Sequence, residues 1–88
     1  MKANQILESI MTDKGVSKAQ LGRAVGIESP DPNNKSYQTD VIGKRLKQKT
    51  MSVTLFSEML DAMGYTIIVA PKGAKKISEG EYEVDNNG

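Results

Sequence analysis

The spacing of apolar side chains along the chain up to Gly64 predicts four amphipathic helices. Within each of four segments, apolar residues recur at intervals of three and four, which places them on one face of a helix. A polar or glycine-containing stretch separates each segment from the next. We expect a mainly α protein with helices at residues 4–14, 18–25, 37–49 and 53–63.

The second predicted helix carries the strongest end signals. Ser17 and Gln20 have the spacing of a capping box, in which each side chain accepts a hydrogen bond from the other residue's backbone amide. Val16 and Leu21 have the spacing of a hydrophobic staple across the helix start. Gly26 follows the last apolar residue and suits the left-handed backbone that often ends a helix. We therefore expect a short helix that is fixed at both ends.

The periodicity changes after Gly64. Residues 65–70 are rich in β-branched side chains and stop before Pro71, which predicts a strand. A lone strand leaves its backbone groups unpaired, and pairing with the same strand of a second subunit would satisfy them. An extension laid over the chain's own helices is the alternative. The residues expected at a dimer interface of this kind are Tyr65, Ile67, Ile68 and Val69.

The residue types present narrow the classes of function. The chain has no cysteine and no histidine, which removes disulfides, thiolate ligands, the commonest metal ligand and the commonest general base. It shows no glycine-rich phosphate loop, no paired carboxylates on one helix face and no marked pair of nucleophile and base. We therefore predict that the protein is not an enzyme and binds no metal or cofactor.

The length of 88 residues predicts a single domain. Residues 1–71 contain the predicted helices and strand, whereas residues 72–88 are polar and too poor in apolar side chains to order themselves. We expect the latter to form a flexible tail. No apolar run approaches the length of a membrane span, and the first residues lack the apolar stretch of a signal peptide. These features predict a cytoplasmic protein with no membrane partner.

Positive charge is concentrated in one segment. The formal net charge is only +1, but residues 35–49 hold five basic residues and one acidic residue, a local net charge of +4. Such a segment can bind a polyanion, although a solvated helix face gives the same pattern. The apolar side chains of the predicted third helix occupy only a narrow strip of its surface. We therefore expect the basic face of this helix to be exposed.

Residues 16–27, Val-Ser-Lys-Ala-Gln-Leu-Gly-Arg-Ala-Val-Gly-Ile, resemble the first half of the helix-turn-helix in the lambda-repressor-like, Cro/XRE-type family. Residues 41–46, Val-Ile-Gly-Lys-Arg-Leu, are similar to the core of the motif's second helix, and residues 56–65 are similar to the family's closing helix. The resemblance covers about residues 4–70 and implies a DNA-binding domain of four to five helices, encoded by a bacterium or a phage. The connection at residues 28–36 departs from the family because it is longer and contains two prolines.

This resemblance implies a transcriptional regulator, most simply a repressor, that binds a palindromic operator on double-stranded DNA as a homodimer. The predicted third helix would lie in the major groove, with its first residues at the base edges and its later basic residues at phosphates. The start of the second helix and the connection would contact the phosphate backbone. The residues expected to contact DNA are Lys18, Gln20, Lys35, Gln38, Thr39, Asp40, Gly43, Lys44, Arg45, Lys47 and Lys49.

The predicted strand and the Ala-Pro-Lys that follows it leave further interpretations open. They are similar to the C-terminal strand of persistence-type antitoxins, which dimerise through this strand and pair with a kinase toxin. One alternative is therefore an antitoxin that holds a toxin through residues 72–88 or an outer helix face. Another is an inhibitor or adaptor that binds a protein on the same fold. The basic segment at residues 35–49 argues against a complete loss of DNA binding.

Overall fold

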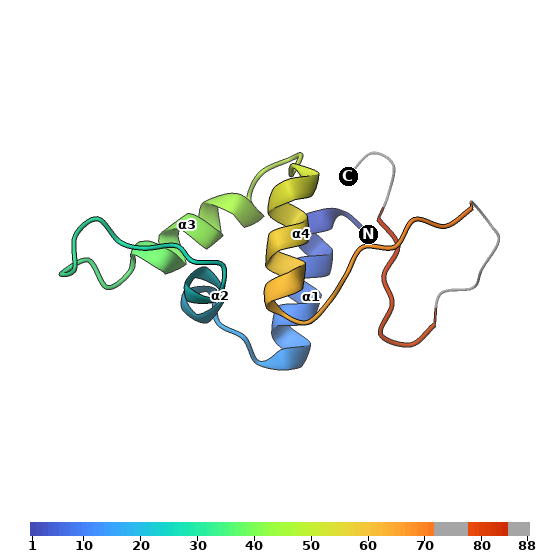
Figure 1. Ribbon diagram of the computed structural model, residues 1–88, viewed down its shortest axis with the longest axis horizontal. Coiled ribbons are helices and arrows are strands. Elements are labelled where there is room, and N and C mark those ends of the chain that lie inside the picture. Colours follow the sequence, from blue (N-terminus) through green and yellow to red (C-terminus); the bar gives the residue numbers. More distant parts are fainter. Residues whose placement is uncertain (72–77, 85–88) are drawn as a thin grey trace.

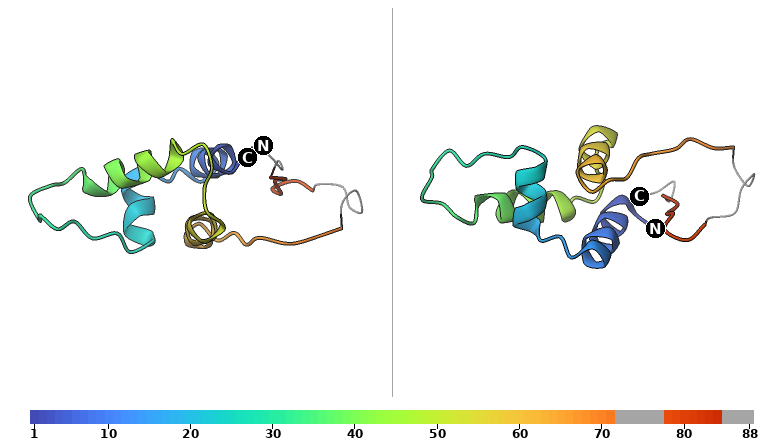
Figure 2. Two further views of the ribbon diagram at one scale, coloured as in Figure 1. Left: turned by 90° about the horizontal axis from the view of Figure 1, so that it is seen from above. Right: turned by 60° about the horizontal axis from the view of Figure 1, so that its bottom comes forward.

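Four helices make up the architecture of the chain. A computed structural model describes residues 1–71 and 78–84, and it confirms the mainly α prediction. Helices α1 and α4 pack together at the centre of the molecule, while α2 lies across α3 to one side (Figures 1 and 2). None of the helices in the described residues is long and apolar enough to cross a bilayer. The helices are α1 (Ala3–Lys14), α2 (Lys18–Ala24), α3 (Tyr37–Leu46) and α4 (Val53–Ala62).

The core lies where the apolar faces of the four helices meet. Every helix contributes at least one side chain that is completely or almost completely buried. Removing a side chain of this size from water contributes about 1.5–3 kcal/mol, so these residues hold the helices to one another. The largest of them are Leu7 and Ile10 from α1, Leu21 from α2, Ile42 from α3 and Met59 from α4.

The predicted capping box and glycine turn at the two ends of α2 are confirmed, and the helix ends at Ala24, one residue before the predicted end. The Gln20 amide donates to Ser17 Oγ over 3.1 Å, and the Ser17 amide donates to Gln20 Oε1 over 2.8 Å. Gly26 has a φ of 83°, which an L side chain rarely adopts. The chain then turns back, and the Ile27 amide donates to the Gly22 carbonyl over 2.9 Å. Local sequence alone is therefore sufficient to start and end this helix.

Helix α3 is shorter than predicted, because it ends at Leu46 and not at Lys49. The Asn4 side chain on α1 donates from Nδ2 to the Leu46 carbonyl over 3.1 Å, which occupies an acceptor at the end of α3. The Lys47 amide bonds to the Lys44 carbonyl, three residues back, so the last turn is tightened. The predicted extension to residue 49 is wrong, and Lys49 lies in the connection to α4.

The segment after α4 leaves the helical body. Its first residue, Tyr65, is half-buried, and the Lys14 ammonium lies 5.5 Å from the centre of its ring. The segment then runs outward (Figure 1), with Ile67 42%, Ile68 71% and Val69 95% exposed. No strand is present among the residues that the structure describes, and these apolar side chains are not covered by the helices.

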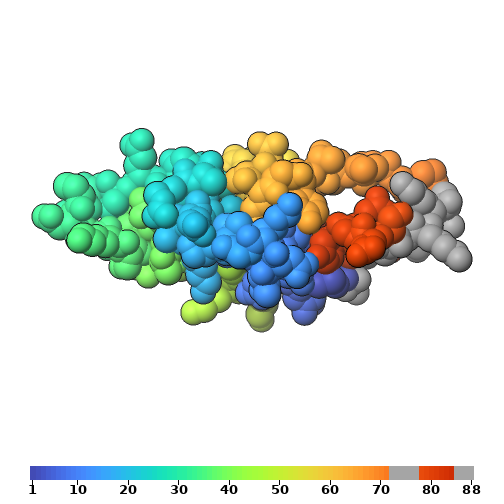
Figure 3. Space-filling view, turned by 90° about the horizontal axis from the view of Figure 1, so that it is seen from below, coloured from blue at the N-terminus to red at the C-terminus, as the bar shows by residue number. Residues whose placement is uncertain are grey.

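Residues 78–84 lie against α1 (Figure 3). The Tyr82 hydroxyl donates to Asp13 Oδ2 over 3.2 Å, and the N-terminal ammonium donates to the Glu83 carbonyl over 3.0 Å. Desolvation is the largest of the causes that raise the pKa of the Tyr82 phenol above its ordinary value, and the hydrogen bond to Asp13 is the second. This described part of the predicted tail is therefore packed through its one aromatic side chain. Residues 72–77 and 85–88 of that tail lie outside the described residues.

Candidate nucleic-acid interface

Helix α2 fixes the position of α3 through a very close contact. Gly22 is buried, and a β-carbon placed on it would lie only 2.6 Å from Cβ of Gln38. The Gln38 side chain also donates from Nε2 to the Ile27 carbonyl over 3.2 Å. Together these contacts hold the first half of α3 against α2 and against the turn that follows it.

One side of α3 is polar and open to solvent. Asp40, Lys44 and Lys47 are exposed and follow one another at intervals of four and three, so they share one side of the helix. Ile42 and Leu46 are buried on the opposite side. Packing therefore turns a stripe with two ammonium groups and one carboxylate outward.

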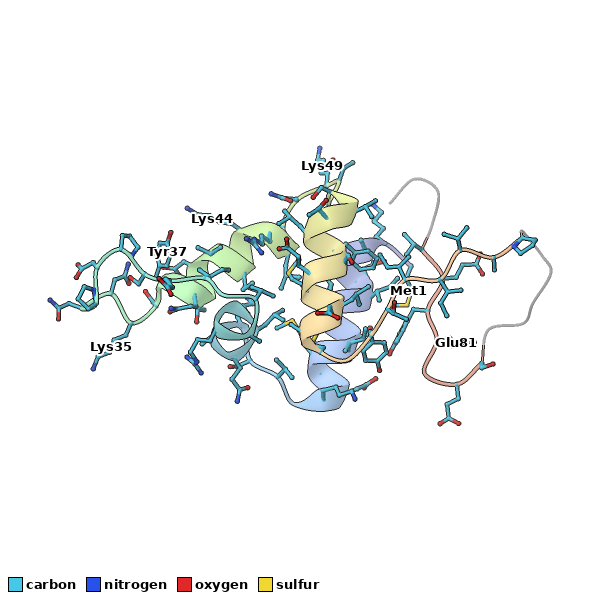
Figure 4. All side chains as sticks on the ribbon, viewed as in Figure 1. Met1, Lys35, Tyr37, Lys44, Lys49 and Glu81 are labelled. Carbon is cyan, nitrogen blue, oxygen red and sulfur yellow. The ribbon has the colours of Figure 1, made fainter. Side chains whose placement is uncertain are left out.

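Tyr37 is a candidate contact that the sequence analysis missed. It is half-buried in the first turn of α3, three residues before Asp40 and seven before Lys44. Figure 4 shows Tyr37 and Lys44 along the same edge of the molecule, with Lys49 further along that edge. The spacing of these residues on a helix could have identified Tyr37 from sequence.

Two residues predicted to read bases are less available than expected. Gln38 and Thr39 are half-buried, and the Gln38 amide is already engaged with Ile27. Asp40 is exposed, with its Oδ2 3.2 Å from the hydroxyl of Ser36 at the start of the helix. Of the three residues predicted to read bases in the first half of α3, Asp40 is therefore the one exposed to solvent.

Lys35 is not brought to the edge that carries Lys44. It lies in the connection between α2 and α3, and its side chain points to the other side of the molecule (Figure 4). Local hydrogen bonds shape this connection. The Ser29 hydroxyl donates to the Asp31 carbonyl over 2.6 Å, and the Asn33 amide donates to Asp31 Oδ1 over 2.9 Å. The structure therefore places Lys35 apart from the polar stripe of α3.

Arg45 is also less accessible than a contact with a DNA phosphate would require. Its side chain is half-buried, and its Nη1 atom is inaccessible to solvent and has no hydrogen-bond partner in the described part of the chain. Lys47, by contrast, is exposed at the C-terminal end of α3. Of these two cations near the C-terminal end of α3, Lys47 is the one that the fold exposes to solvent.

The two predicted contacts on α2 have different surroundings. Lys18 is exposed, and its ammonium lies 3.9 Å from the position of a β-carbon on Gly43 of α3. Gln20 is exposed, but its side-chain oxygen is held by the Ser17 amide in the capping box. The fold therefore brings Lys18, and not Gln20, to α3.

No cluster of three or more carboxylate side chains in the described ranges could hold a metal ion. No protein-family model, curated protein or solved structure matches the chain. The geometry and charge of the side chains around α3 are therefore the features that point to a function.

Proposed function

We propose that the chain is a sequence-specific DNA-binding transcriptional regulator that inserts α3 into the major groove. The observation that supports this most directly is the exposed stripe of α3, which carries Lys44 and Lys47 opposite a buried apolar face. The major groove of B-DNA is wide enough to admit an α-helix, and each base pair shows a distinct pattern of donors and acceptors there. Helix α2 would act as the support that sets the angle of α3.

The residues of the stripe have different roles in this proposal. Lys44, in the middle of the exposed side, would donate to O6 and N7 of a guanine, and Asp40 would accept from N4 of a cytosine. Lys47, at the helix end, would contact a phosphate. Tyr37 would lie at the entry to the groove. The charged contacts would make binding weaken as the salt concentration rises.

The proposed operator is palindromic because the proposed DNA-binding unit is a homodimer. The exposed side chains of Ile68 and Val69 support pairing of residues 65–70 with the same segment of a second copy. This pairing would form the strand that the sequence predicts at residues 65–70, which is not present among the described residues of one chain. Two copies of α3 spaced about 34 Å apart would then meet successive turns of the same DNA face.

Selection from a library of random duplex DNA at low salt tests the proposed function directly. We expect one enriched site with two inverted half-sites whose centres are about 10 base pairs apart. Failure to enrich any sequence would contradict sequence-specific DNA binding. Enrichment of a single half-site would contradict the dimer while supporting the role of α3.

Replacing Ile68 with proline should convert the dimer to a monomer, because proline cannot donate a ladder hydrogen bond. Sedimentation equilibrium measures this change. Val53→Pro is a matched control: Val53 is 73% exposed against 71% for Ile68, and it is the first residue of α4, where proline is tolerated. If Ile68→Pro sediments as the unchanged dimer, pairing through residues 65–70 is wrong.

A further inference from the structure

We propose that Lys18 is a base-reading residue, although it lies on α2, and that Gly43 provides the gap through which it reaches the DNA. This inference rests on the proposed function, since it assigns a residue and a ligand to the same interface. The ligand is the major-groove edge of a guanine, next to the base that Lys44 would read.

The position of the Lys18 ammonium is the first observation. It lies 3.9 Å from the site that a β-carbon on Gly43 would occupy. Gly43 is inside α3 and directly precedes Lys44. The charge of Lys18 therefore lies beside the second half of the proposed recognition helix.

The second observation is that no feature of the fold requires glycine at position 43. Gly43 does not have the positive φ that ends a helix. Apart from adjacent residues and the backbone of α3 itself, the Lys18 ammonium is the only neighbour among the described residues that a β-carbon would meet within 4 Å. Glycine inside a helix costs about 1 kcal/mol relative to alanine. At Gly43 the space left by the missing side chain adjoins Lys18.

The exposed side of α3 is short of hydrogen-bond donors for a guanine, and Lys18 can supply them. The Gln38 amide is turned inward to Ile27, and the carboxylate of Asp40, when ionised, can only accept hydrogen bonds. The donors needed for guanine O6 and N7 must come from other side chains. An ammonium has three donors. Lys18 places one such group beside Gly43, and Lys44, the next residue along α3, exposes a second. A half-site with two neighbouring G·C pairs follows from this arrangement.

The test compares binding to the selected operator with binding to a panel in which each base pair is changed in turn. We expect Lys18→Ala to lose about tenfold in discrimination at one G·C pair, with the preferences at the other positions kept. Lys14→Ala removes the same charge from α1 and should leave the whole profile unchanged. A gel-shift titration at fixed salt measures both variants.

Gly43→Ala tests the gap. Its methyl group would touch the Lys18 ammonium and hinder its approach to the base, so discrimination should fall at the same G·C pair. In the Lys18→Ala background the same change should have no further effect on that pair. This coupling in a double-mutant cycle is expected only if the two residues act together.

Three outcomes would overturn the proposal in different ways. A uniform loss of affinity for all sequences, with a salt slope reduced by about one, would make Lys18 a phosphate contact. If Gly43→Ala still lowers discrimination when Lys18 is absent, Gly43 does not act by leaving room for Lys18. If the unmodified protein binds no DNA at low salt, the proposed function fails and this inference fails with it.

Discussion

Replacing Lys44 and Lys47 together with alanine should abolish operator binding while the free energy of unfolding stays almost unchanged. Both side chains are exposed, and exposed positions without packing contacts contribute little to stability. In the proposed complex the two changes remove one base contact and one phosphate contact, so we expect affinity to fall at least about a hundredfold. A binding titration at low salt and a thermal melt measure the two quantities.

A second variant controls for net charge. Lys14→Glu lowers the net charge by the same two units at the C-terminal end of α1, whereas Asn4, near the other end, bonds to the end of α3. Sedimentation checks that losing the Lys14 contact with Tyr65 leaves the oligomeric state unchanged. The affinity of this variant should stay within about threefold of the unmodified protein, since distant exposed charges are largely screened by salt. Equal losses in the two variants would mean that total charge, and not α3, determines binding. Arg45 is left in place because its buried Nη1 makes a stability effect inseparable from a binding effect.

Replacing Gly22 with alanine should destabilise the fold by about 1–3 kcal/mol, the usual range for overpacking a filled site. The new β-carbon would lie 2.6 Å from Cβ and 3.2 Å from Cα of Gln38, so α2 and α3 must move apart. Each kcal/mol lowers the melting temperature by about 4–8 °C in a domain of this size. Because α2 sets the angle of α3, affinity for DNA should fall as well.

Gly43→Ala is the matched control for stability. It adds the same methyl group to the neighbouring helix, but within residues 1–71 and 78–84 the only non-local atom it meets is the end of a flexible lysine, at 3.9 Å. Removing the helical glycine should make the protein as stable as before or more stable by up to about 1 kcal/mol. Urea denaturation compares the two variants. A Gly22→Ala protein that unfolds at the same urea concentration as the original would show that α2 and α3 do not approach this closely.

The sequence by itself determined the helical class of the fold and the signals that start and end α2. The Ser17 cap and the turn at Gly26 depend on residues at most five positions apart, so their signals are complete within a short window. The concentration of basic residues at 35–49 is likewise a property of the sequence alone. Such local patterns are independent of how the helices pack.

Only the tertiary structure decided where α3 ends and which of its side chains are available to a ligand. The hydrogen bond from Asn4 to the Leu46 carbonyl joins residues 42 positions apart, and no local pattern predicts it. Packing against α2 turned Gln38 inward and brought Lys18 beside Gly43. These outcomes depend on the distance and angle between helices, which arise from the shapes of buried side chains distributed over the whole chain.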